Sequence, residues 1–176
     1  MDVDASTVTI VLMGVSGSGK STVMARLRER LDWPSAEADE FHPPANVAKM
    51  SSGQPLNDAD RLPWLRALAA WIGAREAAGE NCVVTCSALK RSYRDLLREG
   101  HGSVRFVHLA ATADVLQRRM AQRRGHYMPP SLLGSQLETL EPLQPDEPGI
   151  VLSSELPPDQ IVDAIETWLR LSNRAT

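Results

Sequence analysis

The sequence predicts an α/β fold, a three-layer α/β/α sandwich with helices on both faces of a mostly parallel sheet. The first observation is that short apolar runs rich in β-branched residues alternate with longer segments of helical periodicity. This alternation is typical of parallel strands joined by crossover helices. The second is that the first apolar run leads through the glycine-rich segment GVSGSGKS (14–21) into a helix. The 176 residues contain no internal repeat and no interdomain linker, so a single domain over 1–176 is expected.

Three strands are expected in the first half of the chain. VTIVLMG (8–14) and CVVTCSA (82–88) are continuous apolar runs, as expected for strands that are buried on both faces. SAEAD (35–39) is a short strand between them. A helix is predicted over 20–31 because Val23, Leu27 and Leu31 recur at helical spacing. The Ala- and Leu-rich segment 62–78, which carries two tryptophans, predicts the next helix.

The second half continues the alternation. A helix over 91–98 is ended by two nearby glycines, and the strand VRFVHLA (104–110) follows. Thr112 is a suitable N-cap for a helix that runs to about Arg124 and is broken by GHYMPP (125–130). The remaining expected elements are a helix over 131–140, the strand IVLSS (150–154) and a helix over 158–171. The proline-rich segment 141–149 is short enough to be a loop within one domain.

The composition limits the possible partners. The formal net charge is −3 at pH 7, so no overall electrostatic attraction to nucleic acid or an anionic membrane is expected. An aromatic content of 5% offers few stacking platforms for bases. No apolar run approaches the roughly 18–20 residues that span a bilayer, and the N-terminus lacks the basic and apolar regions of a signal peptide. We therefore expect a cytoplasmic protein with neither a nucleic-acid nor a membrane partner.

The two cysteines, Cys82 and Cys86, fall in one predicted strand. The strand residues between them span roughly 13 Å, whereas a disulfide needs Cα atoms within about 7 Å. Both are expected to be reduced structural thiols, which agrees with a cytosolic location.

The segment GVSGSGKS matches G-x-x-x-x-G-K-[ST] between a buried strand and a helix, and this context predicts a phosphate-binding loop. Its glycines let the backbone turn inward, so that consecutive N–H groups point at phosphate oxygens beside the positive end of the helix. Lys20 is expected to reach the β- and γ-phosphates, and the Ser21 hydroxyl to ligate Mg²⁺. The predicted nucleotide-binding residues of this segment are Gly14, Ser16, Gly17, Ser18, Gly19, Lys20, Ser21 and Thr22.

A phosphate loop does not identify a reaction, because switches, motors and kinases share it. The chain has no N-K-x-D run for guanine recognition. The strand CVVTCSALK has no Asp-Glu pair of the kind that motor ATPases carry. The remaining class is a small-molecule kinase that is related to nucleoside monophosphate kinases and binds its acceptor beside the loop. A nucleotide-binding module without phosphoryl transfer is the alternative from another class.

The segment DEFHPPANVAKM (39–50) is expected to form the acceptor wall. Asp39, at the end of the second strand, can orient an acceptor hydroxyl, take its proton late, or hold Mg²⁺ through water. His42 is held by two following prolines and can donate to acceptor hydroxyls. The alternative for His42 is a surface histidine. Glu40 is expected to stay in solvent. Arg61 can bind a carboxylate or phosphoryl oxygen, or else be a solvated helix charge. The acceptor arm spans about 40–80, in which Trp64 and Trp71 are expected to be core.

A lid over about 119–135 is expected on the nucleotide side. Arg119 and Arg123 are four residues apart and share a helix face, ahead of a Gly- and Pro-bearing break. On closing, such a lid brings arginines over the phosphates and excludes water. Arg123 is therefore a catalytic candidate together with Lys20 and Asp39. A solvated basic helix end is the alternative.

Four segments together resemble the gluconokinase family over about residues 8–170: VLMGVSGSGKS, HPPANVAKMSSGQPLNDADRLPWL, CSALKRSYRDLLR and GHYMPPSLLGSQLETLEPL. The resemblance implies transfer of phosphate from ATP, with Mg²⁺, to the 6-hydroxyl of D-gluconate, in a cytoplasmic homodimer. A shikimate-like or other small-metabolite kinase is the alternative within this class. The family often has a glycine before the acceptor-side aspartate, where this chain has Ala38.

The resemblance also sharpens the predictions for single residues. Asp39, His42 and Arg61 occupy the family's acceptor-side positions. Lys90, Arg91 and Arg94 follow the third strand, where open α/β sheets bind ligands, and become candidates for the gluconate carboxylate or the transferred phosphate. A solvated basic helix start is the alternative for these three. His126 and Gln136 are expected near the sugar hydroxyls.

Overall fold

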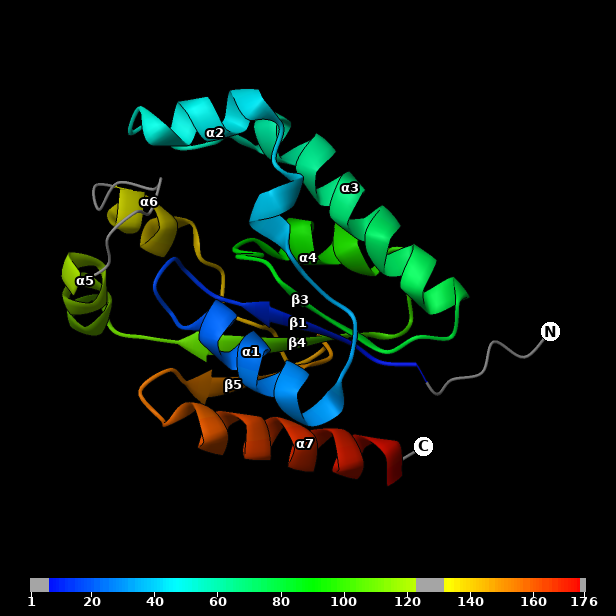
Figure 1. The fold of residues 1–176 in the computed structure, drawn as a ribbon. Helices are drawn as coiled ribbons and strands as arrows, with labels where there is room; N and C mark the ends of the chain where they lie inside the picture. The colour runs from blue at the N-terminus through cyan, green and yellow to red at the C-terminus, as the bar shows by residue number, and fades with distance from the viewer. Residues whose placement is uncertain (1–6, 123–131, 175–176) are drawn as a thin grey trace.

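The computed structural model describes residues 7–122 and 132–174. Within them, five strands form one parallel sheet in the order β2-β3-β1-β4-β5 (Figure 1). The strands are β1 (Thr9–Met13), β2 (Ser35–Glu37), β3 (Cys82–Thr85), β4 (Val104–Ala110) and β5 (Gly149–Ser153). The predicted α/β/α sandwich is confirmed. Strand β1 pairs with both β3 and β4, so the segment that follows it emerges at the centre of the sheet.

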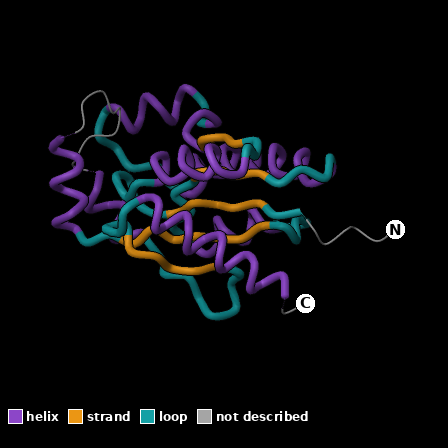
Figure 2. Tube along the Cα trace, turned by 60° about the horizontal axis from the view of Figure 1, so that its bottom comes forward, coloured by secondary structure: helices purple, strands orange, loops and turns teal. Residues whose placement is uncertain are grey.

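Helices cover both faces of this sheet (Figure 2). α3 (Asp58–Ala77) and α4 (Arg91–Arg98) pack on one face, and α1 (Lys20–Leu31) and α7 (Pro158–Arg174) pack on the other. Three further helices lie toward the end of the sheet to which the strand arrows point in Figure 1. They are α2 (Pro44–Ser51), α5 (Ala113–Gln122) and α6 (Leu132–Thr139).

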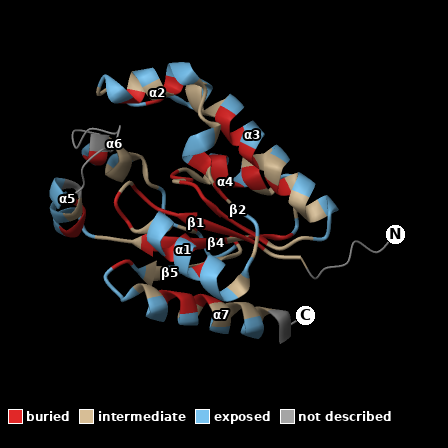
Figure 3. Cartoon of the chain, in the orientation of Figure 1, coloured by how far each residue is buried: buried red, intermediate tan, exposed pale blue. Residues whose placement is uncertain are grey.

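The two apolar layers follow from strands that are buried on both faces. The central strands β1 and β3 are buried throughout (Figure 3). Val11 and Met13 face α3 and α4, whereas Ile10 and Leu12 face α1 and α7. A third, smaller cluster joins the segment after β1 to α5 and α6 through Val15, Leu89, Leu116 and Leu133. α5 and α6 therefore pack directly against the predicted phosphate loop.

The acceptor arm differs most from its prediction. β2 ends at Glu37, and Asp39 lies in the 3₁₀ turn η1 (Ala38–Phe41) rather than at the end of a strand. α3 begins at Asp58, four residues before the expected start at 62, because Asn57 and Asp60 form a reciprocal capping box with N···O distances of 2.8 and 3.0 Å. Trp64 is in the core, as predicted, and Trp71 packs against the same cluster.

Both cysteines are buried free thiols, as predicted. Burial raises the pKa of the Cys86 thiol to about 12, so that it stays protonated at neutral pH. Across the described part of the chain, no helix combines the length and the apolar character needed to cross a membrane.

Arg94 requires a correction, because its side chain is fully buried and already fully bonded. Nε and Nη2 donate to the two carboxylate oxygens of Glu147 at 2.7 and 3.0 Å. Nη1 donates to the carbonyl oxygens of Ala88 and Glu141 at 2.9 and 3.0 Å, and Nη2 donates to that of Pro142 at 3.3 Å. These acceptors use the donors of the guanidinium. Arg94 therefore fixes the segment after β3 to the loop before β5, and it is not available to bind the acceptor as its sequence position suggested.

We predict that Glu147→Ala lowers the free energy of unfolding by about 3–5 kcal/mol, because it leaves the buried Arg94 charge without its carboxylate partner. Asp146→Ala is the matched control. Asp146 is the adjacent acid and pairs with Arg91 at 2.7 Å on an exposed surface, so its loss should cost far less. Urea denaturation of the three proteins makes the comparison. Equal losses in the two variants would contradict the assigned role of the buried pair.

Candidate active site

The predicted phosphate loop is a tight turn that is fixed by close backbone contacts. Gly14 has φ of +143°, and a Cβ at this position would lie 2.8 Å from Ser18 Oγ and 2.9 Å from the Leu109 carbonyl oxygen. Only glycine fits there without displacing the end of β4. The Gly14 amide also donates to the Ser87 carbonyl oxygen at 3.2 Å. The turn is thus held against the carboxyl ends of both neighbouring strands.

Lys20 lies across this turn. Its Nζ donates to the carbonyl oxygens of Gly14 and Val15 at 2.7 and 3.0 Å. The amide of Ser16 donates to Gln136 Oε1 of α6 at 2.6 Å. The loop therefore presents an ammonium group and backbone donors at the start of α1, which together can bind an anionic phosphate chain.

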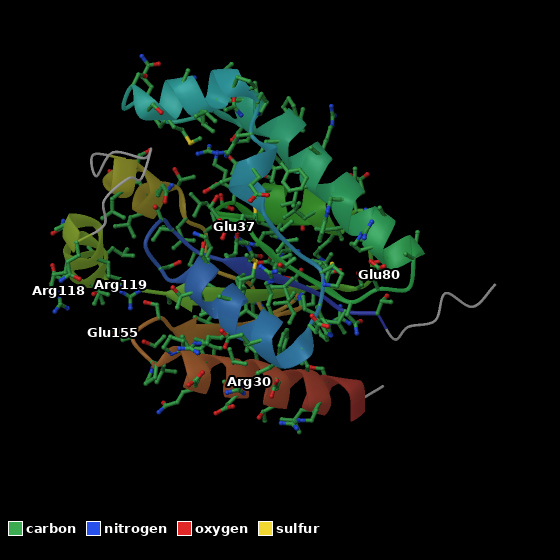
Figure 4. All side chains as sticks on the ribbon, viewed as in Figure 1. Arg30, Glu37, Glu80, Arg118, Arg119 and Glu155 are labelled. Carbon is green, nitrogen blue, oxygen red and sulfur yellow. The ribbon has the colours of Figure 1, made fainter. Side chains whose placement is uncertain are left out.

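One cavity lies on the α7 side of the loop. Its walls come from the loop and α1, from Arg119 of α5, and from the segment after β5, with the lining residues Gly17, Ser18, Gly19, Thr22, Val23, Arg119, Ser154, Glu155, Leu156, Pro157, Pro158 and Ile161. Arg119 donates to the carbonyl oxygens of Gly17 and Ser154 at 3.2 and 2.8 Å. Figure 4 shows Arg119 on α5 near the loop that carries Glu155. The structure thus places Arg119 against the phosphate loop, whereas its place in a closing lid over the phosphates stays a prediction.

A second cavity lies on the other side of the loop, toward the acceptor arm. Its lining contains the predicted residues Lys20, Ser21, Asp39, His42 and Arg61. The other lining residues are Ser16, Glu37, Met50, Leu56, Trp64, Thr85, Cys86, Ser87 and Gln136. This cavity joins the phosphate loop to the segment DEFHPPANVAKM, which the sequence predicted to be the acceptor wall.

His42 is held as a rigid part of this wall. Its ring stacks on Trp64 with centroids 4.1 Å apart and an interplanar angle of 16°. Trp64 is itself fixed by a hydrogen bond from Nε1 to the Ala38 carbonyl oxygen at 2.6 Å. Burial lowers the pKa of His42, Asp39 has the opposite effect, and Arg61 lowers the pKa further. The ring is therefore neutral at neutral pH.

The carboxylate of Asp39 faces this wall. Its Oδ1 lies 4.0 Å from His42 Nε2, and 60% of the side chain is exposed, so a ligand in the cavity can reach it. The backbone at Ala38, the residue before Asp39, does not adopt a conformation that favours glycine. Among described residues other than glycine, Asp32 and Ala88 have positive φ. Ala38 therefore fits where the resembling family often has glycine.

Arg61 is oriented by a cluster that joins α3 to α4. It donates to Tyr93 Oη at 3.0 Å and lies over the same ring. Tyr93 donates in turn to Asp58, which also accepts from Lys90 Nζ at 3.0 Å. These two hydrogen bonds lower the pKa of Asp58. Lys90 is thus paired with Asp58 and is not among the residues that line the acceptor cavity.

The remaining predicted residues are distributed as follows. Arg91 forms an ion pair with Asp146 and does not line either cavity. Gln136 lines the acceptor cavity. Arg123, Arg124 and His126 lie outside the described residues, as does most of the predicted lid.

The sequence did not predict three residues of the site. Glu37 lines the acceptor cavity, Trp64 supports His42, and Tyr93 supports Arg61. The seven-residue spacing of the tryptophans indicated burial, but it contained no signal for the His42 stack.

Comparison with known proteins identifies the family. A family model described as an AAA domain matches residues 9–143. A gluconokinase of Gluconobacter oxydans is 51% identical over 156 residues, which cover 89% of this chain and 88% of the relative. The chain belongs to the gluconokinase family.

Two solved structures extend the similarity to the fold. The crystal structure of a gluconokinase from Sinorhizobium meliloti has 48% identity and a TM-score of 0.81, covering 96% of this chain and 95% of that one. An unliganded sugar kinase from Janibacter has 54% identity and a TM-score of 0.89, covering 93% and 95%. The gluconokinase family assignment thus rests on both sequence and structure across nearly the whole chain.

We predict that acid destabilises the folded chain through its buried histidines. Burial lowers the pKa of both His42 and His108. As the pH falls through the ordinary histidine value of about 6.5, the unfolded chain binds protons that the folded chain does not, so the free energy of unfolding falls. Urea midpoints at pH 7.5 and 5.5 should show this decline, which His42→Gln and His108→Gln should each reduce. Arg118→Gln, at an exposed position, is the control and should retain it. An undiminished decline in both histidine variants would contradict the prediction.

Proposed function

We propose that the chain transfers the γ-phosphoryl group of ATP to the 6-hydroxyl of D-gluconate, giving 6-phosphogluconate and ADP. One observation carries the proposal: Lys20 and Ser21 of the phosphate loop share a cavity with Asp39, His42 and Arg61 of the acceptor arm. Gluconate carries a carboxylate and several hydroxyl groups. The cavity offers the guanidinium of Arg61 for the carboxylate, and it offers side chains that donate or accept hydrogen bonds for the hydroxyl groups. The relatives named gluconokinase support this choice of acceptor over a shikimate-like one.

Each side of the loop has its own part in the reaction. We assign the cavity beside Arg119 and Ser154 to the nucleotide, because it adjoins Gly17 and Gly19. The acceptor cavity holds the carboxylate of Asp39 where a bound hydroxyl can donate to it. Asp39 then orients that hydroxyl for in-line attack and takes its proton late. Lys20, together with Arg119, counters the charge that spreads over the transferred phosphoryl oxygens.

The donor set around the loop fits Mg²⁺, which we propose as the cofactor. The Ser21 hydroxyl and the carboxylates of Glu37 and Asp39 line the same cavity. Oxygen ligands of this kind suit Mg²⁺, which is usually held by one or two protein groups together with water and substrate phosphates. Within the described residues, no group of three or more His, Cys, Asp or Glu side chains is arranged to hold a metal ion. Ser21 would ligate Mg²⁺ directly and Asp39 through water, and the ion would neutralise charge on the phosphates.

Further parts of the proposal rest on the family resemblance. We propose a single catalytic domain with an acceptor arm over about 40–80 and a lid over about 119–135 that carries Arg123 and His126. We also propose a homodimer in the cytoplasm. Two free thiols suit that reducing compartment. The exposed edge strand β5, with Val151 56% exposed, offers a surface for a second copy.

We predict ATP- and Mg²⁺-dependent turnover with gluconate. ADP release should rise above the acceptor-free rate with gluconate and should remain near it with shikimate, AMP or glucose. The product should be a primary phosphate ester, whose ³¹P signal is split by the protons of the adjacent carbon. Rapid turnover of another acceptor, together with no turnover of gluconate, would contradict the proposal. ATP binding by calorimetry with no acceptor-dependent turnover would instead favour a non-catalytic nucleotide-binding module.

We predict that Asp39→Asn lowers kcat for gluconate by about 10²–10⁴-fold, because the hydroxyl loses its base and alignment. The Kd for ATP, measured by calorimetry without acceptor, should change little. Glu40→Gln is the matched control, since Glu40 is the exposed neighbouring acid and does not line the cavity. A near-normal rate for Asp39→Asn, or an equal loss for Glu40→Gln, would remove Asp39 from its assigned role.

A further inference from the structure

Asn46 is a buried polar side chain that the proposed reaction does not use. It lies on α2, and the residue is only 5% exposed. It adjoins the acceptor cavity but is not among the residues that line it. A buried carboxamide is retained at little cost only where its polar atoms have partners. Its partners indicate what it does.

One atom of Asn46, the amide nitrogen, makes two contacts. Nδ2 donates to the Asp60 carbonyl oxygen at 2.9 Å and lies 3.3 Å from His42 Nδ1. The carbonyl fixes the orientation of the amide, because a carbonyl oxygen can only accept. With the amide turned over, Oδ1 would face another oxygen at hydrogen-bond distance. The second proton of Nδ2 is then directed at His42 Nδ1.

This contact determines the protonation of His42. A nitrogen that accepts from an amide carries no proton of its own, so the proton of the neutral ring must reside on Nε2. Nε2 is the nitrogen that lies 4.0 Å from Asp39 Oδ1. The stack on Trp64 fixes the plane of the ring, and Asn46 fixes which of its nitrogens is the donor.

The groups that face His42 are consistent with a neutral ring. Asp39 approaches from η1, Asn46 from α2, and Arg61 and Trp64 from α3. Asp39 favours a charged ring, but burial and the positive charge of Arg61 oppose it. A protonated ring would also place Nδ1–H against the Asn46 amide protons.

We propose that Asn46 is a positioning residue that locks His42 as a neutral Nε2–H donor toward a hydroxyl group of the acceptor. The proposal rests on the proposed function for the identity of that acceptor. Its consequence is that His42 and Arg61 recognise different groups of the acceptor. An uncharged donor has no strong preference for the substrate carboxylate, whereas the guanidinium of Arg61 does. A neutral His42 therefore favours one orientation of an acceptor molecule that has a carboxylate at one end and a hydroxyl at the other.

The first test needs no substrate. Long-range ¹H–¹⁵N correlation spectra of the ¹⁵N-labelled full chain at pH 7.5 report which imidazole nitrogen carries the proton, and His42→Gln assigns the signal. We expect His42 to be the Nε2–H tautomer. In Asn46→Ala the signal should move toward a mixture of tautomers. In Asn46→Asp, whose carboxylate can accept from Nδ1–H, His42 should become doubly protonated at a higher pH than in the wild type. Gln160→Ala, which removes an exposed carboxamide from α7, is the matched control and should leave the signal unchanged.

A proton on Nδ1 in the wild type overturns the proposal, even if no variant folds. An unchanged tautomer in a folded Asn46→Ala protein overturns it as well.

The second test measures the effect on the acceptor. Loss of one oriented hydrogen bond should raise KM for gluconate by about tenfold in Asn46→Ala, with KM for ATP nearly unchanged. In Asn46→Asp the acid limb of the pH profile of kcat/KM should move to higher pH. Equal changes in both KM values would indicate a general structural defect and would overturn the positioning role. If gluconate is not turned over at all, the proposed function fails, whereas the tautomer measurement still decides the role of Asn46.

Discussion

The close approach at Gly14 is the constraint on which the rest of the site depends. β1 lies between β3 and β4, and its chain must turn at once where both neighbours end. The Leu109 carbonyl oxygen and Ser18 Oγ leave no space for a Cβ at this position. The loop amides and Lys20 are therefore placed by the centre of the sheet rather than by flexible segments. A phosphate bound there is located relative to the most buried strands of the molecule, which favours a precise geometry for transfer.

The two cavities attach to this fixed turn through separate sets of contacts. On the nucleotide side, Arg119 joins α5 to Gly17 and to Ser154 after β5. On the acceptor side, Trp64 joins α3 to the Ala38 carbonyl and supports His42 through its ring. These two sets of supports share no residue. This separation is consistent with the proposed function, in which the arm selects the acceptor and the loop carries the transfer chemistry.

The sequence predicted the architecture well, because strands buried on both faces and amphipathic helices leave strong patterns. It also identified the loop, whose chemistry is contained in one short segment. It could not distinguish an arginine that binds a ligand from one that fixes the fold. Arg61 and Arg94 both lie in the first turn of a helix near the site, yet Arg94 meets Glu147 and three carbonyl groups from loops that are close only in the folded chain. The early start of α3 depends on a local capping box at Asn57. The 3₁₀ turn at Asp39, by contrast, accompanies a hydrogen bond from Trp64 to the Ala38 carbonyl oxygen, 26 residues away in the chain. Long-range partners of this kind leave no local pattern.

Gln136 links the two sides of the site at a single backbone amide. Its Oε1 accepts from Ser16 N–H, one of the loop donors assigned to phosphate, while its side chain lines the acceptor cavity. The amide has a single proton, so a phosphate oxygen that accepted it would compete with Gln136 Oε1. α6 is also packed against the loop through Leu133, in the cluster that contains Val15. α6 therefore contacts both the residues after β1 and the acceptor cavity. The described contacts thus join the phosphate loop and the acceptor cavity through one helix, α6.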